Sequence, residues 1–280
     1  MIIAAILDSG LAPNRPEFPH LLPGHNFSLI TRNPHWVKGM PTREFWMAPD
    51  PRDTADDYGH GTHVTGIVVA NAQTPITILP VKISSANGQS TAGMIMDGMR
   101  FAIASGAKVI NLSIGSAGVD DYEDIMLYAE HSGVVVVCAA GNNGSNELYY
   151  PGADPLCLSV GAVNHHGDRC GFSNHGAWVN CYGLGQSVNS TVPNYPCPIW
   201  SRSGRRILSG TSMAAPMVTA QVCDLIARNP GIKPAEVRGH LQGYSYKPVP
   251  VIPVPIPIII PTTPTNPTLP IIPSIPTTSA

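Results

Sequence analysis

Three short motifs in this chain hold the residue types needed for nucleophilic attack on a carbonyl carbon. The motifs are Leu-Asp-Ser-Gly at 7–10, Gly-His-Gly-Thr-His-Val-Thr-Gly at 59–66 and Leu-Ser-Gly-Thr-Ser-Met-Ala-Ala-Pro at 208–216. A serine hydroxyl is a poor nucleophile until a neighbouring base takes its proton, and an imidazole can do this near neutral pH. We therefore expect Ser212 to be the nucleophile, His60 the base, and Asp8 the carboxylate that orients His60.

A fourth motif offers a hydrogen-bond donor for the negative charge that develops on the attacked oxygen. It is Ala-Ala-Gly-Asn-Asn-Gly at 139–144, which follows an apolar run rich in valine. An amide side chain at the end of a strand can donate to such an oxyanion. We expect Asn142 to be this donor, assisted by the backbone N–H of Ser212. That N–H lies at a helix start, where the first N–H groups have no partner within the helix.

Short apolar runs rich in β-branched residues alternate with longer helical patterns along the chain. This alternation is typical of β–α–β units, and it predicts an α/β fold with an open, mostly parallel sheet and helices on both faces. Because open α/β sheets bind substrates at the carboxyl ends of their strands, Asp8 would lie at the substrate-binding edge. The expected strands are 2–7, 76–82, 109–113, 134–139 and 157–163, and the expected helices are 60–71, 91–105, 121–131, 212–229 and one that begins at Pro234.

With the four motifs in this order, the chain resembles the subtilisin-like serine peptidases, the subtilases, over about residues 1–243. The resemblance implies a serine endopeptidase that binds a peptide as an added strand between two edge segments. It also implies a pocket for one substrate side chain, with Tyr149 near its base, where a tyrosine would shorten the pocket. The substrate-binding residues that the resemblance implies are Gly88, Gln89, Ser90, Ser113, Ile114, Gly115, Ala139, Ala140, Gly141 and Tyr149.

Two alternatives to general proteolysis stay open. One is a peptidase dedicated to the processing of a single precursor. The other is a catalytically silent subtilisin scaffold that binds extended peptides. Because Asp8, His60 and Ser212 are all present, the sequence argues against the silent scaffold.

Several acidic and histidine residues near these motifs are expected to have structural roles. His63 follows His60 by three residues, but no glutamate accompanies the pair as in a zinc-binding helix, so no metal site is predicted there. Asp120, Asp121 and Asp124 are expected to cap a helix rather than to bind calcium. The connection after the histidine helix is too short for the calcium loop of many subtilases. We therefore expect no metal and no cofactor.

Two segments do not follow the α/β pattern. Residues 12–58 have no sustained period and predict a long surface loop, either a lid over the substrate cleft or a plain insertion. Asp56 and Asp57 within it are expected to be solvated, with a preference for basic substrate groups as the alternative. From residue 247 onward the chain is rich in Pro, Ile, Val and Thr, which predicts an extended tail. The expected domains are a peptidase domain at 1–246 and a tail at 247–280 that is a spacer or a docking strip for a protein partner.

Composition and charge exclude several partners. The formal net charge is -2, so no basic field gathers nucleic acid. No apolar run approaches the roughly 20 residues of a membrane-spanning helix, and the N-terminus lacks the basic start of a signal peptide. We expect a monomer that acts on a peptide or protein substrate in the cytoplasm or in another compartment reached without a classical signal.

The six cysteines have no CxxC spacing and are expected to be free thiols, with a bridge between Cys170 and Cys181 left open.

Overall fold

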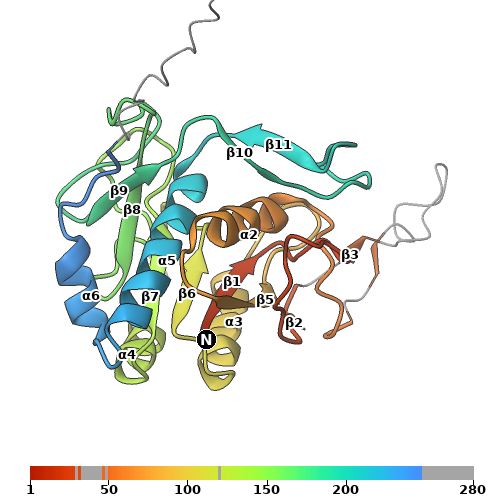
Figure 1. The fold of residues 1–280 in the computed structure, drawn as a ribbon, viewed down its shortest axis with the longest axis horizontal. Helices are drawn as coiled ribbons and strands as arrows, with labels where there is room; N and C mark the ends of the chain where they lie inside the picture. Colours follow the sequence, from red (N-terminus) through yellow and green to blue (C-terminus); the bar gives the residue numbers. More distant parts are fainter. Residues whose placement is uncertain (29–30, 33–45, 48–49, 119–120, 248–280) are drawn as a thin grey trace, which may run out of the picture. The chain divides into compact units, whose positions relative to one another are not determined.

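A parallel sheet forms the centre of the fold (Figure 1). The structure, a computed structural model, describes residues 1–28, 31–32, 46–47, 50–118 and 121–247. Within these residues the main sheet has seven strands in the order β2-β5-β1-β6-β7-β8-β9, and each neighbouring pair is parallel. The strands of this sheet are β1 (Ile2–Asp8), β2 (His25–Asn26), β5 (Ile76–Lys82), β6 (Val109–Leu112), β7 (Val135–Ala139), β8 (Leu158–Val163) and β9 (Cys181–Leu184). The antiparallel pairs outside it are β3 (Thr31–Arg32) with β4 (Trp46–Met47) and β10 (Val188–Thr191) with β11 (Arg205–Leu208).

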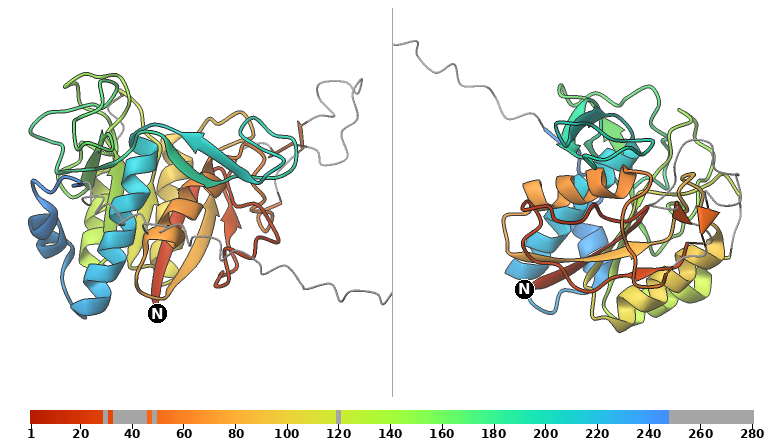
Figure 2. Two further views of the ribbon diagram at one scale, coloured as in Figure 1. Left: turned by 45° about the horizontal axis from the view of Figure 1, so that its top comes forward. Right: turned by 90° about the vertical axis from the view of Figure 1, so that its right-hand side faces the viewer.

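Helices cover both faces of the sheet. α2 (His60–Asn71) and α5 (Thr211–Arg228) lie on one face, and α3 (Ala92–Ala104) and α4 (Glu123–His131) lie on the other (Figure 2). The chain crosses the sheet in one direction from β1 through α2 to β5, and in the opposite direction from β5 through α3 to β6. Because such crossovers are right-handed, this reversal puts the helices on opposite faces. A further helix, α6 (Pro234–Leu241), follows α5. The predicted α/β class with an open, mostly parallel sheet is confirmed.

The strands are apolar on both sides because both faces of the sheet are buried. Along β1, Ala4 and Ile6 belong to a core with α2 and α5, whereas Ala5 and Leu7 belong to a second core with α3 and α4. This alternation follows from the two-residue period of a strand. A strand that is buried on both faces has a continuous apolar sequence, which is what β1 shows.

The predicted elements agree closely with the observed ones. The helix predicted at 60–71 and the strand predicted at 76–82 have the observed bounds, and the other predicted elements differ by one or two residues at an end. The largest shift is at α4, where Asp121 lies before the helix and its carboxylate accepts the N–H of Glu123. Asp120, which was expected to share this capping role, lies outside the described residues.

Two details differ from the sequence predictions. The segment at 12–58, predicted to be irregular throughout, contributes β2 to the edge of the main sheet. The sequence did not reveal this strand, because two residues are too few to show a period. Residues 29–30, 33–45 and 48–49 of this segment lie outside the described part, and the lid interpretation stays a prediction. Cys170 and Cys181 are not joined by a disulfide, so the bridge left open between them does not form. Cys170 Sγ faces Gln186, whereas Cys181 Sγ faces Ser159 O.

The predicted tail lies outside the described residues from position 248 onward. In the described part of the chain, no helix is both long enough and apolar enough to cross a lipid bilayer. The described residues up to 246 lie within the range of the predicted peptidase domain.

The start of α5 lies very close to the end of β9, because glycines there leave room for its backbone. A Cβ on Gly183 would lie 2.6 Å from Ala214 O, and a Cβ on Gly185 would lie 2.7 Å from Gly210 O. The N–H of Gly210 in turn donates to Gly185 O at 2.8 Å. These contacts determine where the first turn of α5 sits relative to the sheet.

We predict that Gly183→Ala destabilises the fold by about 1–3 kcal/mol, the usual cost of adding a methyl group to a tightly packed site. The methyl group would push Ala214 and the start of α5 away from β9. Urea unfolding of the variant and of the wild type measures the difference.

The matched control is Gly239→Ala on α6, where an added Cβ meets nothing within 4 Å. Its stability should stay level or rise by about 0.5–1 kcal/mol, because alanine favours a helix more than glycine does. Equal unfolding free energies for the two variants would contradict the proposed close contact at Gly183.

Candidate active site

A cleft of about 220 Å³ opens at the carboxyl ends of β1, β5, β6 and β7. The chain places β5 on one side of β1 and then β6 on the other, so the direction of strand addition reverses at β1. Open α/β sheets bind ligands at such reversal points. The cleft is lined by Asp8, Ser9, Tyr58, His60, Ser84, Gly88, Ser113, Ile114, Gly115, Ala139, Gly141, Asn142, Tyr149, Thr211 and Ser212.

Asp8 and His60 form a hydrogen-bonded pair beside this cleft. Asp8 ends β1 and is 1% exposed, and its two carboxylate oxygens lie 2.8 and 3.0 Å from His60 Nδ1. His60 is the first residue of α2, and Gly59 before it has a φ of 103°. A Cβ on Gly59 would also lie 1.8 Å from Ile199 O, so this turn requires glycine. With Nδ1 bound to Asp8, Nε2 is the ring nitrogen left to exchange a proton.

The charges around His60 favour its protonated form. Burial by itself lowers the pKa of the imidazole, but the charge of Asp8, the hydrogen bond with Asp8 and the charge of Asp56 together outweigh burial and raise this pKa. The same interactions stabilise the imidazolium that forms when His60 accepts a proton. His60 is therefore suited to proton transfer near neutral pH.

Ser212 lies in the first turn of α5, and its hydroxyl donates to a backbone oxygen rather than to His60. The acceptor is Ser113 O at 3.1 Å. In return, Ser113 Oγ donates to Ser212 O at 3.0 Å. That oxygen is free within the helix because Pro216, four residues later, has no N–H. Rotation of the Ser212 side chain would be needed to bring Oγ to His60, and such catalytic hydrogen bonds often form only with bound substrate.

Two buried polar residues that the sequence reasoning did not identify hold Ser113 in place. Asn111 Nδ2 donates to Ser113 Oγ at 3.0 Å, and Thr219 Oγ1 donates to Asn111 Oδ1 at 2.8 Å. Asn111 and Thr219 are both fully buried. This chain of bonds ties the end of β6 to the middle of α5. An asparagine within an apolar strand was the signal that could have revealed it, because a buried amide needs partners.

Asn142 follows β7 and is oriented by the residue next to Ser212. Its Oδ1 accepts the N–H of Thr211 at 2.8 Å and the Thr211 hydroxyl at 3.1 Å. These bonds identify Oδ1 and leave Nδ2 as the donor of the amide. A Cβ on Gly210 would lie 3.5 Å from Asn142 Nδ2 and 3.7 Å from Ser212 N, so both nitrogens border the same space.

Asn174, which the sequence reasoning also missed, holds the loop that carries Asn142. The side chain is 1% exposed, and its Nδ2 donates to Ala140 O at 2.9 Å. Its Oδ1 accepts the N–H groups of Asn143 at 2.9 Å and Ser145 at 3.3 Å. No local pattern marks Asn174, because it reaches this loop from a distant part of the chain.

The ring of Tyr149 stands between the two expected walls of the substrate pocket. A Cβ on Gly115 would lie 2.6 Å from Tyr149 Cε1, and a Cβ on Gly141 would lie 2.8 Å from Tyr149 Cγ. The phenol donates to Gly115 O at 2.5 Å, and burial raises the pKa of this phenol. The ring therefore fills the space between the two glycines.

Among the residues expected along the substrate, Gln89, Ser90 and Ala140 are not part of the cleft lining. Gln89 O accepts the N–H of Ser85 at 2.9 Å, and Ala140 O is the acceptor for Asn174 described above. These carbonyl oxygens are therefore engaged within the protein. The other expected substrate-binding residues line the cleft, namely Gly88, Ser113, Ile114, Gly115, Ala139, Gly141 and Tyr149.

The prediction that Asp56 and Asp57 are solvated charges is wrong. Asp56 is fully buried, and its carboxylate accepts N–H groups at the start of α2. Asp57 pairs with Lys82, which is itself fully buried at the end of β5. Burial also removes Asp56 from any direct contact with a substrate. Loop composition could not reveal these contacts, because the partners come from other elements.

His63 lies one turn after His60 and joins α2 to the hairpin of β10 and β11. It is fully buried, and its Nε2 donates to Arg206 O at 3.0 Å. Burial lowers the pKa of His63 to about 4. In the described part of the chain, its Nδ1 has no hydrogen-bond partner, and no group of three or more His, Cys, Asp or Glu side chains is gathered for a metal ion.

The chain is similar to known proteases over most of its length. A sequence model of the subtilase family matches residues 2–245. The cell wall-associated protease of Bacillus subtilis (strain 168) is 36% identical over 196 residues, which cover 67% of this chain and 21% of that protein. Subtilisin BL of Lederbergia lenta is 32% identical over 205 residues, which cover 70% of this chain and 73% of that protein. The crystal structure of a cold adapted subtilisin-like serine proteinase matches with a TM-score of 0.68 and 25% identity, over 85% of this chain and 80% of that chain.

The chain therefore belongs to the subtilase family of serine endopeptidases. The family resemblance drawn from the four motifs is confirmed. The chain spans about a fifth of the cell wall-associated protease, so the similarity to that protein concerns one segment of it.

We predict that His63 makes the fold less stable as the pH falls from about 6.5 to about 4. The pKa of this buried imidazole is about 4, below the 6.5 of an exposed one, so the unfolded chain takes up a proton first. Stability therefore rises with pH in this window, and the total contribution is about 3 kcal/mol. Urea unfolding at several pH values measures the slope.

The comparison is with His63→Gln, which has no group that titrates in this window. The variant should lose the part of the pH slope that His63 contributes, even if its stability at neutral pH is lower. Identical slopes in the variant and the wild type would show that His63 does not titrate as described.

Proposed function

We propose that this chain hydrolyses peptide bonds through an acyl-enzyme formed on Ser212, with His60 as the general base and Asp8 as its orienting carboxylate. The observation that carries the proposal is the hydrogen-bonded pair of Asp8 and His60 in the cleft that Ser212 also lines. A serine next to an oriented imidazole is the arrangement that activates a hydroxyl for attack.

In the first step, the Ser212 hydroxyl leaves Ser113 O and gives its proton to His60 Nε2 as Oγ bonds to the substrate carbonyl carbon. The electron pair of the C=O bond moves onto the oxygen. Asn142 Nδ2 and the Ser212 N–H donate to this oxyanion, and one such donor contributes on the order of 2.7–4 kcal/mol, a scale measured in a subtilisin. The imidazolium then passes its proton to the leaving nitrogen, and the C–N bond breaks.

In the second step, water replaces the amine. His60 takes a proton from the water molecule while the water oxygen attacks the ester carbon. Asn142 Nδ2 and the Ser212 N–H donate to the new oxyanion. The ester bond to Ser212 breaks, and Oγ recovers the proton from His60. Asp8 stays ionised throughout and keeps Nδ1 protonated, so that Nε2 is the nitrogen that exchanges protons.

The substrate would bind along the segment at 113–115, with one side chain directed at the pocket that Tyr149 occupies. Because the ring fills the space between Gly115 and Gly141, only a small side chain fits before the bond that is cut. Such a restriction narrows the range of substrates. It is compatible with the processing of one dedicated precursor as well as with general proteolysis.

The first test is labelling with a fluorophosphonate probe. Ser212 Oγ should attack phosphorus, fluoride should leave, and the protein should gain the mass of the phosphonyl group. Wild-type protein should react within minutes, and Ser212→Ala should not react. Intact-protein mass spectrometry measures the labelled fraction.

Ser203→Ala is the matched control, because Ser203 is an exposed serine whose hydroxyl contacts only its own turn. This variant should react like the wild type. Failure of the wild type to react across a range of pH would instead favour a silent peptide-binding scaffold.

We predict that Tyr149→Ala changes the preferred residue before the cleaved bond from small to aromatic. Removing the ring opens the space between Gly115 and Gly141, and kcat/KM for an aromatic residue there should rise roughly tenfold or more. Profiling a peptide library with both proteins measures this preference.

Tyr149→Phe separates the bulk of the ring from its hydrogen bond to Gly115 O. This variant should keep the preference for small residues, since the ring still fills the pocket. A wild-type protein that already prefers aromatic residues would overturn the proposed restriction.

A further inference from the structure

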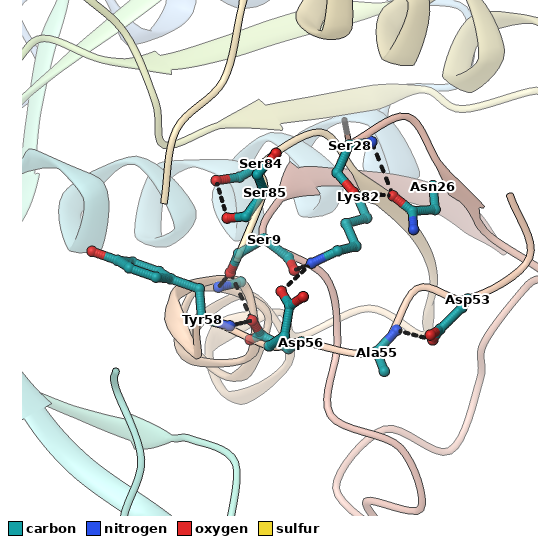
Figure 3. Close-up of polar contacts among 12 residues, drawn as sticks. Ser9, Asn26, Ser28, Asp53, Ala55, Asp56, Tyr58, Lys82, Ser84 and Ser85 are labelled. Carbon is teal, nitrogen blue, oxygen red and sulfur yellow. Dashed lines mark hydrogen bonds and ion pairs between the residues drawn. The ribbon is translucent and has the colours of Figure 1, made fainter. Parts of the chain in front are cut away.

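The carboxylate of Asp56 lies between the end of β1 and the start of α2 and is bonded to both. Its Oδ1 accepts the Ser9 hydroxyl at 2.8 Å and the Gly59 N–H at 2.6 Å. Its Oδ2 accepts the N–H of Thr62 at 2.8 Å and the Thr62 hydroxyl at 2.6 Å. The side chain is fully buried, so water does not compete for these bonds. Figure 3 shows Asp56 next to Ser9 and Tyr58.

Each of these partners is one or two residues from the Asp8–His60 pair. Ser9 follows Asp8 directly, and its Oγ also accepts the N–H of Gly61, the residue after His60, at 2.9 Å. A single hydroxyl therefore links the residue after Asp8 to the residue after His60. Asp56 anchors this hydroxyl from the other side.

Asp56 also serves as the cap of α2. Gly59 at the N-cap position has no side chain that could accept the first N–H groups of the helix. Asp56 accepts two of these groups, and its negative charge is favourable at the positive end of the helix dipole. The start of the helix, and with it His60, is therefore held by a residue outside the helix.

A buried lysine holds the same turn from its other side. Lys82 Nζ donates to Ser9 O at 2.6 Å and to Asp57 Oδ1 at 2.5 Å. Lys82 is opposite Asp8 in the parallel pairing of β1 with β5. A buried charge needs partners, and Ser9 O is one of the partners of the Lys82 ammonium group. The contact therefore keeps the backbone of Ser9 in one position.

We propose that Asp56 is a positioning residue for the catalytic pair: it holds the turn after Asp8 and the start of α2 together, and its negative charge stabilises the imidazolium of His60. It does so without touching the substrate. The inference rests on the proposed function, because the pair matters only if His60 acts as the base. The charge of Asp56 is one of the causes of the raised pKa of His60, next to that of Asp8.

The other charged side chains near this junction include those of Asp8, Asp57 and Lys82. Asp8 on β1 is bonded to His60 directly. His63 lies one turn along α2, and its pKa is about 4, so it is neutral wherever His60 titrates. Asp57 and Lys82 form an ion pair with each other. Replacing Asp56 with asparagine therefore removes one negative charge and leaves Asp8 and the Asp57–Lys82 pair in place.

The test compares the rate of fluorophosphonate labelling of the wild type and of Asp56→Asn as a function of pH. Asparagine keeps the shape of the side chain but loses the charge and half of the acceptors. The maximal rate should fall on the order of tenfold to a hundredfold, the scale expected when a reacting group is misplaced by about 1 Å. The acid limb of the profile should shift to lower pH, because the pKa of His60 falls without the charge of Asp56.

The matched control is Asp224→Asn. Asp224 is also buried and also accepts backbone N–H groups, those of Gln73 and Thr74, which follow the far end of α2. The twelve residues of α2 separate it from His60, or about 18 Å along the helix. This variant should lower the melting temperature but keep the labelling rate and the pH profile of the wild type.

An NMR titration of the His60 ring in both proteins provides a measurement that needs no catalysis. The pKa should be lower in Asp56→Asn than in the wild type. An unchanged pKa and an unchanged acid limb would overturn the proposal and leave Asp56 with a role in stability only. If the wild type is not labelled but the pKa shifts, the proposed hydrolysis fails, and with it the catalytic role of the pair, whereas the effect of the Asp56 charge on His60 stands.

Ser9→Ala is the second variant, for the case that Asp56→Asn does not fold. It removes the hydroxyl that links Asp56 to Gly61 but keeps the charge of Asp56. The labelling rate should fall several-fold with a smaller shift of the acid limb. A labelling rate equal to that of the wild type would contradict the proposed link.

Discussion

The parallel hydrogen bonding of β1 with β5 and β6 is the constraint on which the site depends. The register pairs Asp8 with Lys82 on one side and Leu7 with Leu112 on the other, so the three strands end at the same level. Parallel strands bring only their carboxyl ends to this edge. Asp8, the buried lysine and the segment that begins at Ser113 therefore meet there, although they are far apart in the sequence.

Two helix starts complete the arrangement. α2 brings His60 and α5 brings Ser212 to the cleft, and the two helices pack against each other on one face of the sheet. The first turn of a helix carries N–H groups without partners inside the helix. At α2 two of these groups donate to Asp56 and one donates to Ser9 Oγ, whereas at α5 the Ser212 N–H borders the same space as Asn142 Nδ2. The same property of a helix start thus serves positioning at one helix and a candidate oxyanion site at the other.

The polar residues around the site are buried and almost all of them are bonded to one another. Asn111 and Lys82 contact Ser113 and Ser9 of the cleft lining, and Asn174 holds the loop that carries Asn142. Buried polar groups cost free energy unless they are paired, so each of these contacts permits few alternative arrangements. Such networks make a site rigid, which is what transfer of a proton between fixed atoms requires.

The sequence alone determined the α/β class, most element bounds, the family and the four motifs, because each of these is written in local residue types and in the period of apolar positions. It did not determine that Asp56 is buried, that Lys82 neutralises Asp57, that Asn174 holds the loop of Asn142, or that Ser212 Oγ donates to Ser113 O. Each of these facts concerns two segments whose distance is set by the order of strands in the sheet. Only the tertiary structure could decide them, because burial and partner choice depend on which strand ends and helix starts come together.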